Sequence, residues 1–181
     1  MESKKILVIK ASPRINGNSD ILADSFIKGI DQTNHQVKEI ALRDHQIGFC
    51  KGCLACQNGK GCVIKDGANN IVQEIKKADV LIFATPIYFY QMNGQMKTLL
   101  DRTNPLFIQD YQFRDVYLLA TCADDALESI NGTIKGLEGW IKCFDKSRLK
   151  GVVKGLGVDQ YGEMKNHHEI LDQAFLIAKN L

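Results

Sequence analysis

The stretch ILVIKASPRINGNS, residues 6–19, decides the fold of this chain. It begins with a continuous apolar run, Ile6–Ile9, passes through a polar loop and leads into a helical pattern. Apolar residues recur at every fourth position of that pattern, at Leu22, Phe26 and Ile30. A short continuous apolar run is typical of a strand that is buried on both faces of a parallel sheet. The stretch therefore predicts the first strand–loop–helix unit of an α/β fold.

The same unit repeats along the chain. Val80–Ala84 and Val116–Ala120 predict two more buried strands, whereas the interrupted segments Gln36–Ala41 and Gly151–Leu156 predict weaker strands at the sheet edges. Helical patterns fill the remaining intervals, around Ile71–Ile75, Met96–Leu100, Leu127–Phe144 and Ile170–Leu181. Weak second and fifth strands select the flavodoxin-like order 2-1-3-4-5, which places them at the edges. We therefore expect a doubly wound α/β fold, with a five-stranded parallel sheet and helices on both faces.

Composition excludes several classes of protein. The chain has 181 residues, of which 45% are hydrophobic and 24% charged, as in an ordinary globular domain. The net charge of +2 comes with no basic patch, so we expect no nucleic-acid partner. The longest apolar stretch, Val80–Tyr90, is too short to cross a membrane, and the N-terminus does not read as a signal peptide. We expect one domain, residues 1–181, in the cytoplasm, with no membrane partner and with reduced cysteines.

The polar loop after the first strand is a candidate phosphate site. Ligands of an open α/β sheet bind at the carboxyl ends of the strands, here between the first and third strands. The loop leads into a helix N-terminus, which favours a phosphate, and it contains Ser12, Asn18, Ser19 and the cation Arg14. Neither G-x-G-x-x-G nor a P-loop signature is present, so neither a tightly bound dinucleotide nor a P-loop NTPase is indicated. The alternative is a polar turn with a helix cap.

The loops after the third and fourth strands are candidates for holding a planar ring. Three aromatic residues lie within TPIYFYQMNG, residues 85–94, where a heterocycle could stack on them or where they could pack as core. The loop Thr121–Asp124 has small and polar residues that would let a ring edge approach the backbone. A receiver-like phosphoacceptor is excluded, because Lys10–Ser12 and Ala84–Pro86 lack the acidic residues that it needs.

Four of the six cysteines fall within thirteen residues. They are spaced C-x2-C-x2-C-x5-C, at Cys50, Cys53, Cys56 and Cys62. Cysteines separated by two residues hold iron–sulfur clusters in ferredoxin-type segments, whereas structural zinc normally uses two separate C-x2-C knuckles. A disulfide set is disfavoured in the expected cytoplasmic context. Two interpretations remain: a [4Fe–4S] cluster, or a glycine-rich loop with reduced, metal-free thiols. In both, residues 43–68 form a Cys-rich insertion in the domain.

Three segments together resemble the NADPH-dependent FMN reductase family. Residues 9–19 resemble the loop that binds the FMN phosphate, residues 85–89 the second flavin loop, and residues 96–102 the helix that follows it. The cysteine run is similar to that of the iron–sulfur flavoprotein subgroup, which combines FMN with a [4Fe–4S] cluster. Similar runs also occur in family members that are not known to carry a cluster. The resemblance covers residues 4 to about 105.

The resemblance implies a domain that binds FMN non-covalently and assembles as a homodimer or homotetramer. It implies phosphate ligands at Ser12, Arg14, Asn18 and Ser19, an isoalloxazine flanked by Pro86, Ile87, Tyr88 and Phe89, and a ring edge near Thr121, Cys122 and Ala123. NAD(P)H would supply hydride, and electrons would pass to a quinone, an azo or nitro compound, a flavin or a protein. Because the flavin performs the chemistry, no catalytic acid or base is expected.

Three functions are therefore compatible with the sequence. The first is an FMN-dependent NAD(P)H oxidoreductase with a small-molecule acceptor. The alternative is an iron–sulfur flavoprotein that acts as an electron-transfer carrier. The third is a zinc- or thiol-based regulatory module on the same scaffold.

Glycines in the fourth helical pattern bear on assembly. Gly132, Gly136 and Gly139 lie opposite the apolar stripe of Leu127–Phe144. Because an interior glycine disfavours a helix, the three predict either a broken helix or the close approach of another backbone. We expect a homo-oligomer whose interface includes this segment or the Gly94–Arg102 helix.

Overall fold

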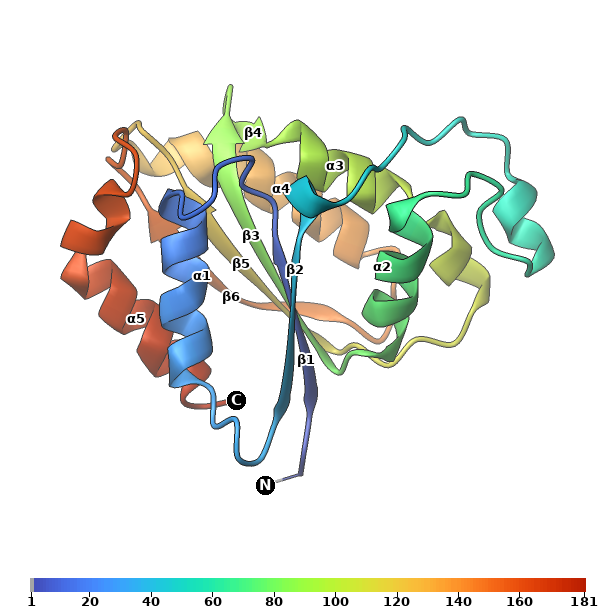
Figure 1. Cartoon of the computed structure of the whole chain (residues 1–181), viewed down its shortest axis with the longest axis horizontal. Helices are drawn as coiled ribbons and strands as arrows, with labels where there is room; N and C mark the ends of the chain where they lie inside the picture. The colour runs from blue at the N-terminus through green and yellow to red at the C-terminus, as the bar shows by residue number, and fades with distance from the viewer. Residues whose placement is uncertain (1) are drawn as a thin grey trace.

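The computed structural model describes residues 2–181, and within them five parallel strands form a twisted sheet (Figure 1). The strands are β1 (Lys5–Lys10), β2 (Gln36–Ala41), β3 (Val80–Tyr88), β5 (Asp115–Thr121) and β6 (Arg148–Gly155). Their order is β2-β1-β3-β5-β6, and a two-residue strand, β4 (Gln91–Met92), pairs antiparallel with the end of β3. The flavodoxin-like order 2-1-3-4-5, counted over the parallel strands, is confirmed.

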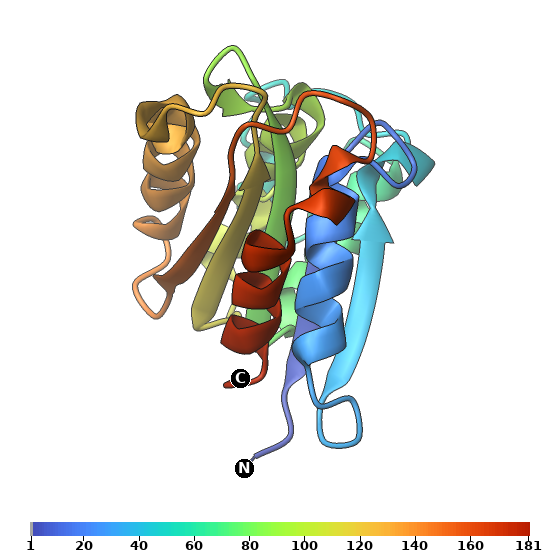
Figure 2. The ribbon, with the colours of Figure 1, turned by 90° about the vertical axis from the view of Figure 1, so that its left-hand side faces the viewer.

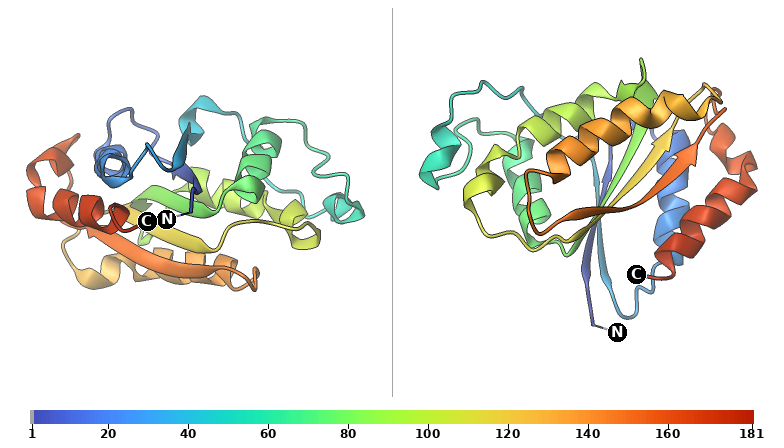
Figure 3. Two further views of the ribbon diagram at one scale, coloured as in Figure 1. Left: turned by 90° about the horizontal axis from the view of Figure 1, so that it is seen from below. Right: turned by 180° about the vertical axis from the view of Figure 1, so that it is seen from behind.

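Helices cover both faces of the sheet, as expected (Figures 2 and 3). One face carries α1 (Asn18–Gly29) and α5 (His168–Ala178), which lie side by side. The other face carries α2 (Gly67–Lys77), α3 (Gly94–Asp101) and α4 (Asn131–Ile141). Short 3-10 helices lie between these elements: η1 (Leu42–Asp44), η2 (Ala55–Asn58), η3 (Asn104–Ile108), η4 (Leu127–Ile130) and η5 (Glu163–Asn166). No helix within residues 2–181 has the length and apolar character needed to cross a membrane.

Strand β1 explains why the apolar runs predict the fold. Ile6 and Val8 belong to the core under α1 and α5, whereas Leu7 and Ile9 belong to the core under α2, α3 and α4. Successive side chains of a strand point to opposite faces, so a strand that is covered on both faces must be apolar at every position. The edge strand β2 is exposed at three of its six positions, Gln36, Lys38 and Glu39, which permits these polar residues.

The third strand differs from the sequence prediction at its carboxyl end. The apolar run predicts an end at Ala84, but β3 continues to Tyr88. Thr85 and Pro86 still pair with β5, and Ile87 and Tyr88 pair with β4, which folds back on them. The two turn residues, Phe89 and Tyr90, have φ angles of +50° and +63°. Two-residue hairpins of the primed type require positive φ, yet bulky aromatic residues rarely adopt it. The predicted second flavin loop is therefore a hairpin with a strained tip.

The glycines of α4 are explained by this hairpin. A Cβ atom on Gly132 would lie 2.4 Å from the carbonyl oxygen of Tyr90, and one on Gly136 would lie 3.3 Å from Met92 Cε. A Cβ atom on Gly139 would meet nothing within 4 Å. The predicted close approach of another backbone therefore occurs within this chain at Gly132, and α4 is unbroken from Asn131 to Ile141.

Two alanine substitutions in α4 should have opposite effects on stability. Gly132→Ala should lower the free energy of unfolding by roughly 1–3 kcal/mol, because the new methyl group overlaps the hairpin backbone. Gly139→Ala should raise it by up to about 1 kcal/mol, because alanine favours the helix and the site is open. Urea unfolding followed by circular dichroism measures both. Equal shifts for the two variants would contradict the packing of the hairpin on α4.

Candidate functional site

The buried side chain of Asn93 joins the first two loops at the carboxyl edge of the sheet. Its Nδ2 donates to the carbonyl oxygen of Ala11 at 2.6 Å, and its Oδ1 accepts from the N–H of Met96 at 3.2 Å, which caps α3. Its own N–H donates to Thr85 Oγ1 at 3.3 Å. The loop after β1, the end of β3 and the start of α3 are thus held together. Sequence reasoning missed this residue, although an Asn directly before a helical pattern signals a cap.

The loop after β5 joins the same edge. The N–H of Cys122 donates to Gly155 at 2.8 Å, and Tyr90 Oη at the hairpin tip donates to Asp124 Oδ2 at 3.3 Å. The N–H of Ala126 and then the hydroxyl of Ser129 lower the pKa of Asp124, so this carboxylate is an acceptor for the tyrosine. The three loops expected to form a site therefore do lie at one edge.

The start of α1 offers free hydrogen-bond donors. The N-cap residue is Gly17, and no side chain caps the helix, so its first N–H groups lack an acceptor. The hydroxyl of Ser19 is buried and has no hydrogen-bond partner among the described residues. Buried polar groups are rarely left unpaired in native proteins, so these donors are available to an acceptor. A helix N-terminus in this state suits a phosphate.

The other predicted phosphate residues are arranged differently. Ser12 Oγ donates to the carbonyl oxygen of Arg14 at 2.9 Å and accepts from its N–H at 3.1 Å, which closes a turn. Asn18 donates through Nδ2 to the carbonyl oxygens of Val158 and Gln160, at 3.2 and 3.0 Å. Arg14 is exposed. The side chains of Ser12 and Asn18 therefore shape the loop, while Ser19 and Arg14 are available to a ligand.

Ion pairs next to this loop were not predicted from the sequence, and they hold the loop and its neighbouring elements in place. Arg43 Nη1 donates to Asp20 Oδ2 at 2.8 Å and to the carbonyl oxygen of Ser12 at 3.3 Å. Burial raises the pKa of Asp20, and Arg43 opposes this rise. Lys10 pairs with two carboxylates, Asp24 at 2.5 Å and Glu39 at 2.6 Å, and these outweigh the effect of burial to raise its pKa. These pairs fix α1 and the edge strand β2 beside β1.

Some of the residues predicted to bind the ring are buried and others are exposed. Pro86 of β3 lies beside Thr121 of β5 in the sheet, so the two strands present a continuous edge. Ile87 and Cys122 are buried in the core, and Ala123 is exposed. Tyr88 and Phe89 project at the hairpin, where Phe89 is 98% exposed. The structure therefore brings Pro86 and the Thr121–Ala123 loop together and places Phe89 at the periphery.

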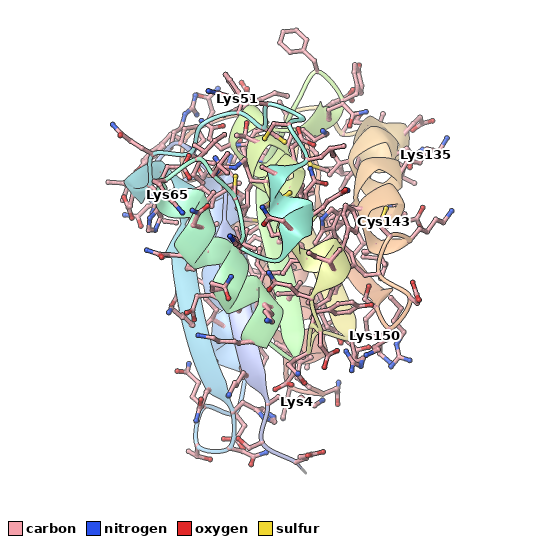
Figure 4. The ribbon with its side chains drawn as sticks, turned by 90° about the vertical axis from the view of Figure 1, so that its right-hand side faces the viewer. Lys4, Lys51, Lys65, Lys135, Cys143 and Lys150 are labelled. Carbon is pink, nitrogen blue, oxygen red and sulfur yellow. The ribbon has the colours of Figure 1, made fainter. Side chains whose placement is uncertain are left out.

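The cysteine segment extends from the sheet beside α2 and α3 (Figure 1). Cys50 and Cys53 are exposed, Cys56 is buried and Cys62 is partly buried. All four line the same cavity, of about 20 Å³. Burial, reinforced by the neighbouring thiols, raises the pKa of Cys56. The other two cysteines lie elsewhere: Cys122 in the core and Cys143 at the end of α4 (Figure 4).

The fit of a metal group to these thiols depends on the kind of group. Within residues 2–181, no three His, Cys, Asp or Glu side chains are placed to hold one metal ion. A [4Fe–4S] cluster makes a different demand, because each thiolate binds its own iron and the four sulfur atoms lie farther apart. The donor set fits such a cluster in number and chemistry. A cavity of 20 Å³ is the space of one water, so the loop must expand to admit it.

A buried ion pair anchors the cysteine segment. Arg102, which is 1% exposed, donates to both carboxylate oxygens of Asp66, at 2.6 and 2.9 Å, and to the carbonyl oxygen of Gly48 at 2.7 Å. Asp66 in turn accepts from the N–H groups of Gly48 and Ala68, the second of which caps α2. These bonds close the segment between Gly48 and Asp66. They outweigh burial and lower the pKa of Asp66.

Comparisons with known sequences identify the family and the relatives of this chain. The family model described as NADPH-dependent FMN reductase matches residues 4–136. An iron–sulfur flavoprotein of Methanocaldococcus jannaschii is 33% identical over 111 residues, which are 61% of this chain and 57% of that protein. The chain thus spans little more than half the length of this relative. YwqN of Bacillus subtilis, whose name describes an NAD(P)H-dependent FMN-containing oxidoreductase, is 30% identical over 188 residues, 97% of each chain.

Solved structures share the fold. An NAD(P)H:quinone oxidoreductase of Methanothermobacter marburgensis has a TM-score of 0.73 and 16% identity, covering 98% of this chain and 96% of that one. An azoreductase of Bacillus anthracis has a TM-score of 0.72 and 17% identity, covering 98% of this chain and all of that one, 100%. At these identities the likeness is one of fold.

Removing the charge of Asp66 should strongly destabilise the protein at neutral pH. Asp66→Asn leaves Arg102 buried without its counter-charge, and we expect a loss of about 3 kcal/mol. The folded pKa of Asp66 lies below its unfolded value, so the ion pair contributes fully above pH ~4 and its contribution is lost as pH falls through the folded pKa.

Urea unfolding at neutral and acidic pH measures this difference. The gap between wild type and Asp66→Asn should be constant near neutrality and narrow below pH ~4. Asp110→Asn is the matched control, because its partner Lys146 and Asp110 itself are both exposed, and it should change stability little. A similar loss in both variants would show that the buried pair has no special role.

Proposed function

Since the chain belongs to the NADPH-dependent FMN reductase family, we propose that it is an FMN-dependent NAD(P)H oxidoreductase with a small-molecule electron acceptor. The observation that carries the proposal is the uncapped N-terminus of α1, with the unpartnered, buried hydroxyl of Ser19 beside it. These donors lie at the carboxyl edge of the sheet between β1 and β3, where open α/β sheets bind their ligands.

In this proposal FMN binds along the carboxyl edge. Its phosphate accepts from the first N–H groups of α1 and from Ser19, with Arg14 supplying charge and with Ser12 and Asn18 shaping the loop. The isoalloxazine lies along Pro86–Phe89 and the Thr121–Ala123 loop, with Ile87 and Cys122 supporting it from the core. When bound, the flavin accepts hydride from NAD(P)H and passes the electrons on.

The chain's own residues orient the cofactor and leave one side open to substrates. Asn93 keeps the first loop, β3 and α3 in register, so that the phosphate and ring positions are fixed relative to each other. Exposed apolar side chains surround the edge, at Ile15, Phe89, Leu127 and Tyr161. Such a rim suits a flat, apolar acceptor, which favours a quinone, an azo or nitro compound or a free flavin. No side chain is assigned as a general acid or base.

The second candidate function is that of an iron–sulfur flavoprotein acting as an electron-transfer carrier. The specific observation in its favour is that Cys50, Cys53, Cys56 and Cys62 line one cavity. The surroundings are basic, with Lys51, Lys60 and Lys65 in or beside the segment, and a cluster bound by four thiolates carries net negative charge. The relatives named iron–sulfur flavoproteins add support.

We further propose that residues 1–181 act as one domain in the cytoplasm and assemble as a homodimer or homotetramer. Two apolar cores on the opposite faces of one sheet support the single domain. The exposed aromatic hairpin supports assembly, because a fully exposed Phe89 gains by burial against a second surface. Light scattering of the FMN-loaded protein measures the oligomeric state, and a monomer at micromolar concentration would contradict the assembly.

Spectroscopy of freshly purified protein tests the first proposal. We expect a yellow solution with flavin absorption that bleaches when NAD(P)H is added anaerobically and recovers when a quinone is added. Flavin that NAD(P)H does not reduce would favour the electron carrier. A colourless protein that does not bind added FMN would contradict both candidates.

The phosphate loop is tested by substitution at Ser19. Ser19→Ala should weaken FMN binding by roughly 1–3 kcal/mol, because it removes a buried donor from a charged acceptor. Arg14→Ala should act in the same direction. Ser25→Ala is the matched control on the same helix, since the Ser25 hydroxyl already donates to Leu171 at 2.8 Å. Titration with riboflavin, which lacks the phosphate, should give equal affinities for all variants. Equal losses for FMN and riboflavin would place the phosphate elsewhere.

A further inference from the structure

The turn after α3 directs side-chain N–H groups toward the first and last thiols of the cysteine segment. Asn104 Nδ2 donates to Cys50 Sγ at 3.7 Å, and the backbone N–H of Gly52 donates to the same sulfur at 3.5 Å. Arg102 and Cys62 line the same cavity, together with Asn104 and Cys50. One residue of this short turn thus contacts the first cysteine of the C-x2-C-x2-C-x5-C run, and a second shares a cavity with the last one.

Arg102 has one N–H that its structural role does not use. Its Nη1 and Nη2 atoms donate to five acceptors: the carbonyl oxygens of Gly48 and Ile64, both oxygens of Asp66, and Asn69 Oδ1. Its Nε is buried and has no partner in the described part of the chain. A buried guanidinium N–H without an acceptor is costly, so its presence calls for a ligand.

The thiol cavity is where that acceptor would lie. Arg102 lines this cavity together with the four cysteines and Asn104. Asp101, the carboxylate in the lining, is already paired with Lys97 at 2.6 Å and is exposed. The lysines of the segment, Lys51 and Lys65, are exposed to solvent (Figure 4). Cysteine sulfur atoms are therefore the acceptors of this cavity that a ligand bound there would bring within reach of the Arg102 N–H.

We propose that Arg102 and Asn104 are positioning residues for an iron–sulfur cluster, which donate N–H groups to the sulfur atoms of Cys62 and Cys50 and so raise its reduction potential. The inference rests on the second candidate function above. Donors to ligating sulfur stabilise the more negative, reduced cluster, which raises the potential. The same bonds hold the two outer cysteines in place while the loop expands around the cluster.

Helix α3 connects the carboxyl edge of the sheet to the thiol cavity. The helix begins at its cap Asn93, which contacts the loop after β1, and ends at Arg102. Because the helix has only eight residues, roughly 12 Å of chain separates the flavin edge from the thiol cavity. The cluster would therefore be positioned by the same element that positions the flavin.

The experiment compares three variants of the full-length protein loaded with FMN. Asn104→Ala removes one donor, Arg102→Lys keeps the charge but removes the Nε–H, and Asn70→Ala is the control on α2, outside the cavity lining. Each is reconstituted anaerobically with iron and sulfide, and iron and acid-labile sulfide are counted. Redox titration followed by EPR then gives the midpoint potential of the cluster, and visible absorbance gives that of the flavin.

We expect about four iron atoms per chain in wild type and in Asn104→Ala. The cluster potential should fall in Asn104→Ala and Arg102→Lys and stay unchanged in Asn70→Ala, while the flavin potential stays the same in all. A purely structural role would alter loading or stability without moving the potential of clusters that do form.

Two results would overturn the inference, and they are distinguishable. If Asn104→Ala is fully loaded and its cluster has the wild-type potential, the proposed role of the turn is contradicted and the iron–sulfur function still stands. A wild-type protein that takes up no iron and sulfide would remove the second candidate function and this inference together, while leaving the FMN oxidoreductase. If Arg102→Lys does not fold, Asn104→Ala decides, because Asn104 is only partly buried.

Discussion

The buried amide of Asn93 is the interaction on which the carboxyl edge of the sheet depends. Two hydrogen bonds of this amide and one of the Asn93 backbone N–H connect the loop after β1, the strand β3 and the first turn of α3, segments more than eighty residues apart at the extremes. An apolar core positions strands and helices but leaves the loops above it free. Asn93, which is 1% exposed, restricts these loops, because a buried amide that loses a hydrogen bond destabilises the folded state.

The hairpin that precedes Asn93 is strained, and its surroundings maintain the strain. Phe89 and Tyr90 both have positive φ, which costs each aromatic residue of the order of 1 kcal/mol or more. Pairing of β3 with β4, the bond from Tyr90 to Asp124 and the close approach of Gly132 hold the turn. Strain of this kind is found at functional sites, where a side chain must be held in a position that the free chain would avoid.

Features that depend on neighbouring residues can be predicted from the sequence, whereas features that depend on contacts between distant segments cannot. Strand order follows from local evidence, since a run such as Ile6–Ile9 reports burial on both faces and a polar strand reports an edge. Ser19 follows from its place at a helix start. Asn93, Arg102 and the bonds of Asn18 do not, because each depends on contact between distant segments: the Asn18 amide meets Val158, 140 residues away. The length of β3 is likewise set by its pairing with β5 and then with β4, which an apolar run does not encode.

The contacts of Asn18 have an evolutionary consequence. The family match ends at residue 136, yet the loop that would carry the phosphate is braced by Val158, Gln160 and Met164, and by Tyr161 Oη, which donates to the carbonyl oxygen of Ile15 at 2.6 Å. Under the proposed function, substitutions in this C-terminal quarter would therefore alter cofactor retention without touching the shared motif. The proposal thus makes the firmness of flavin binding depend on a part of the chain that lies outside the family match.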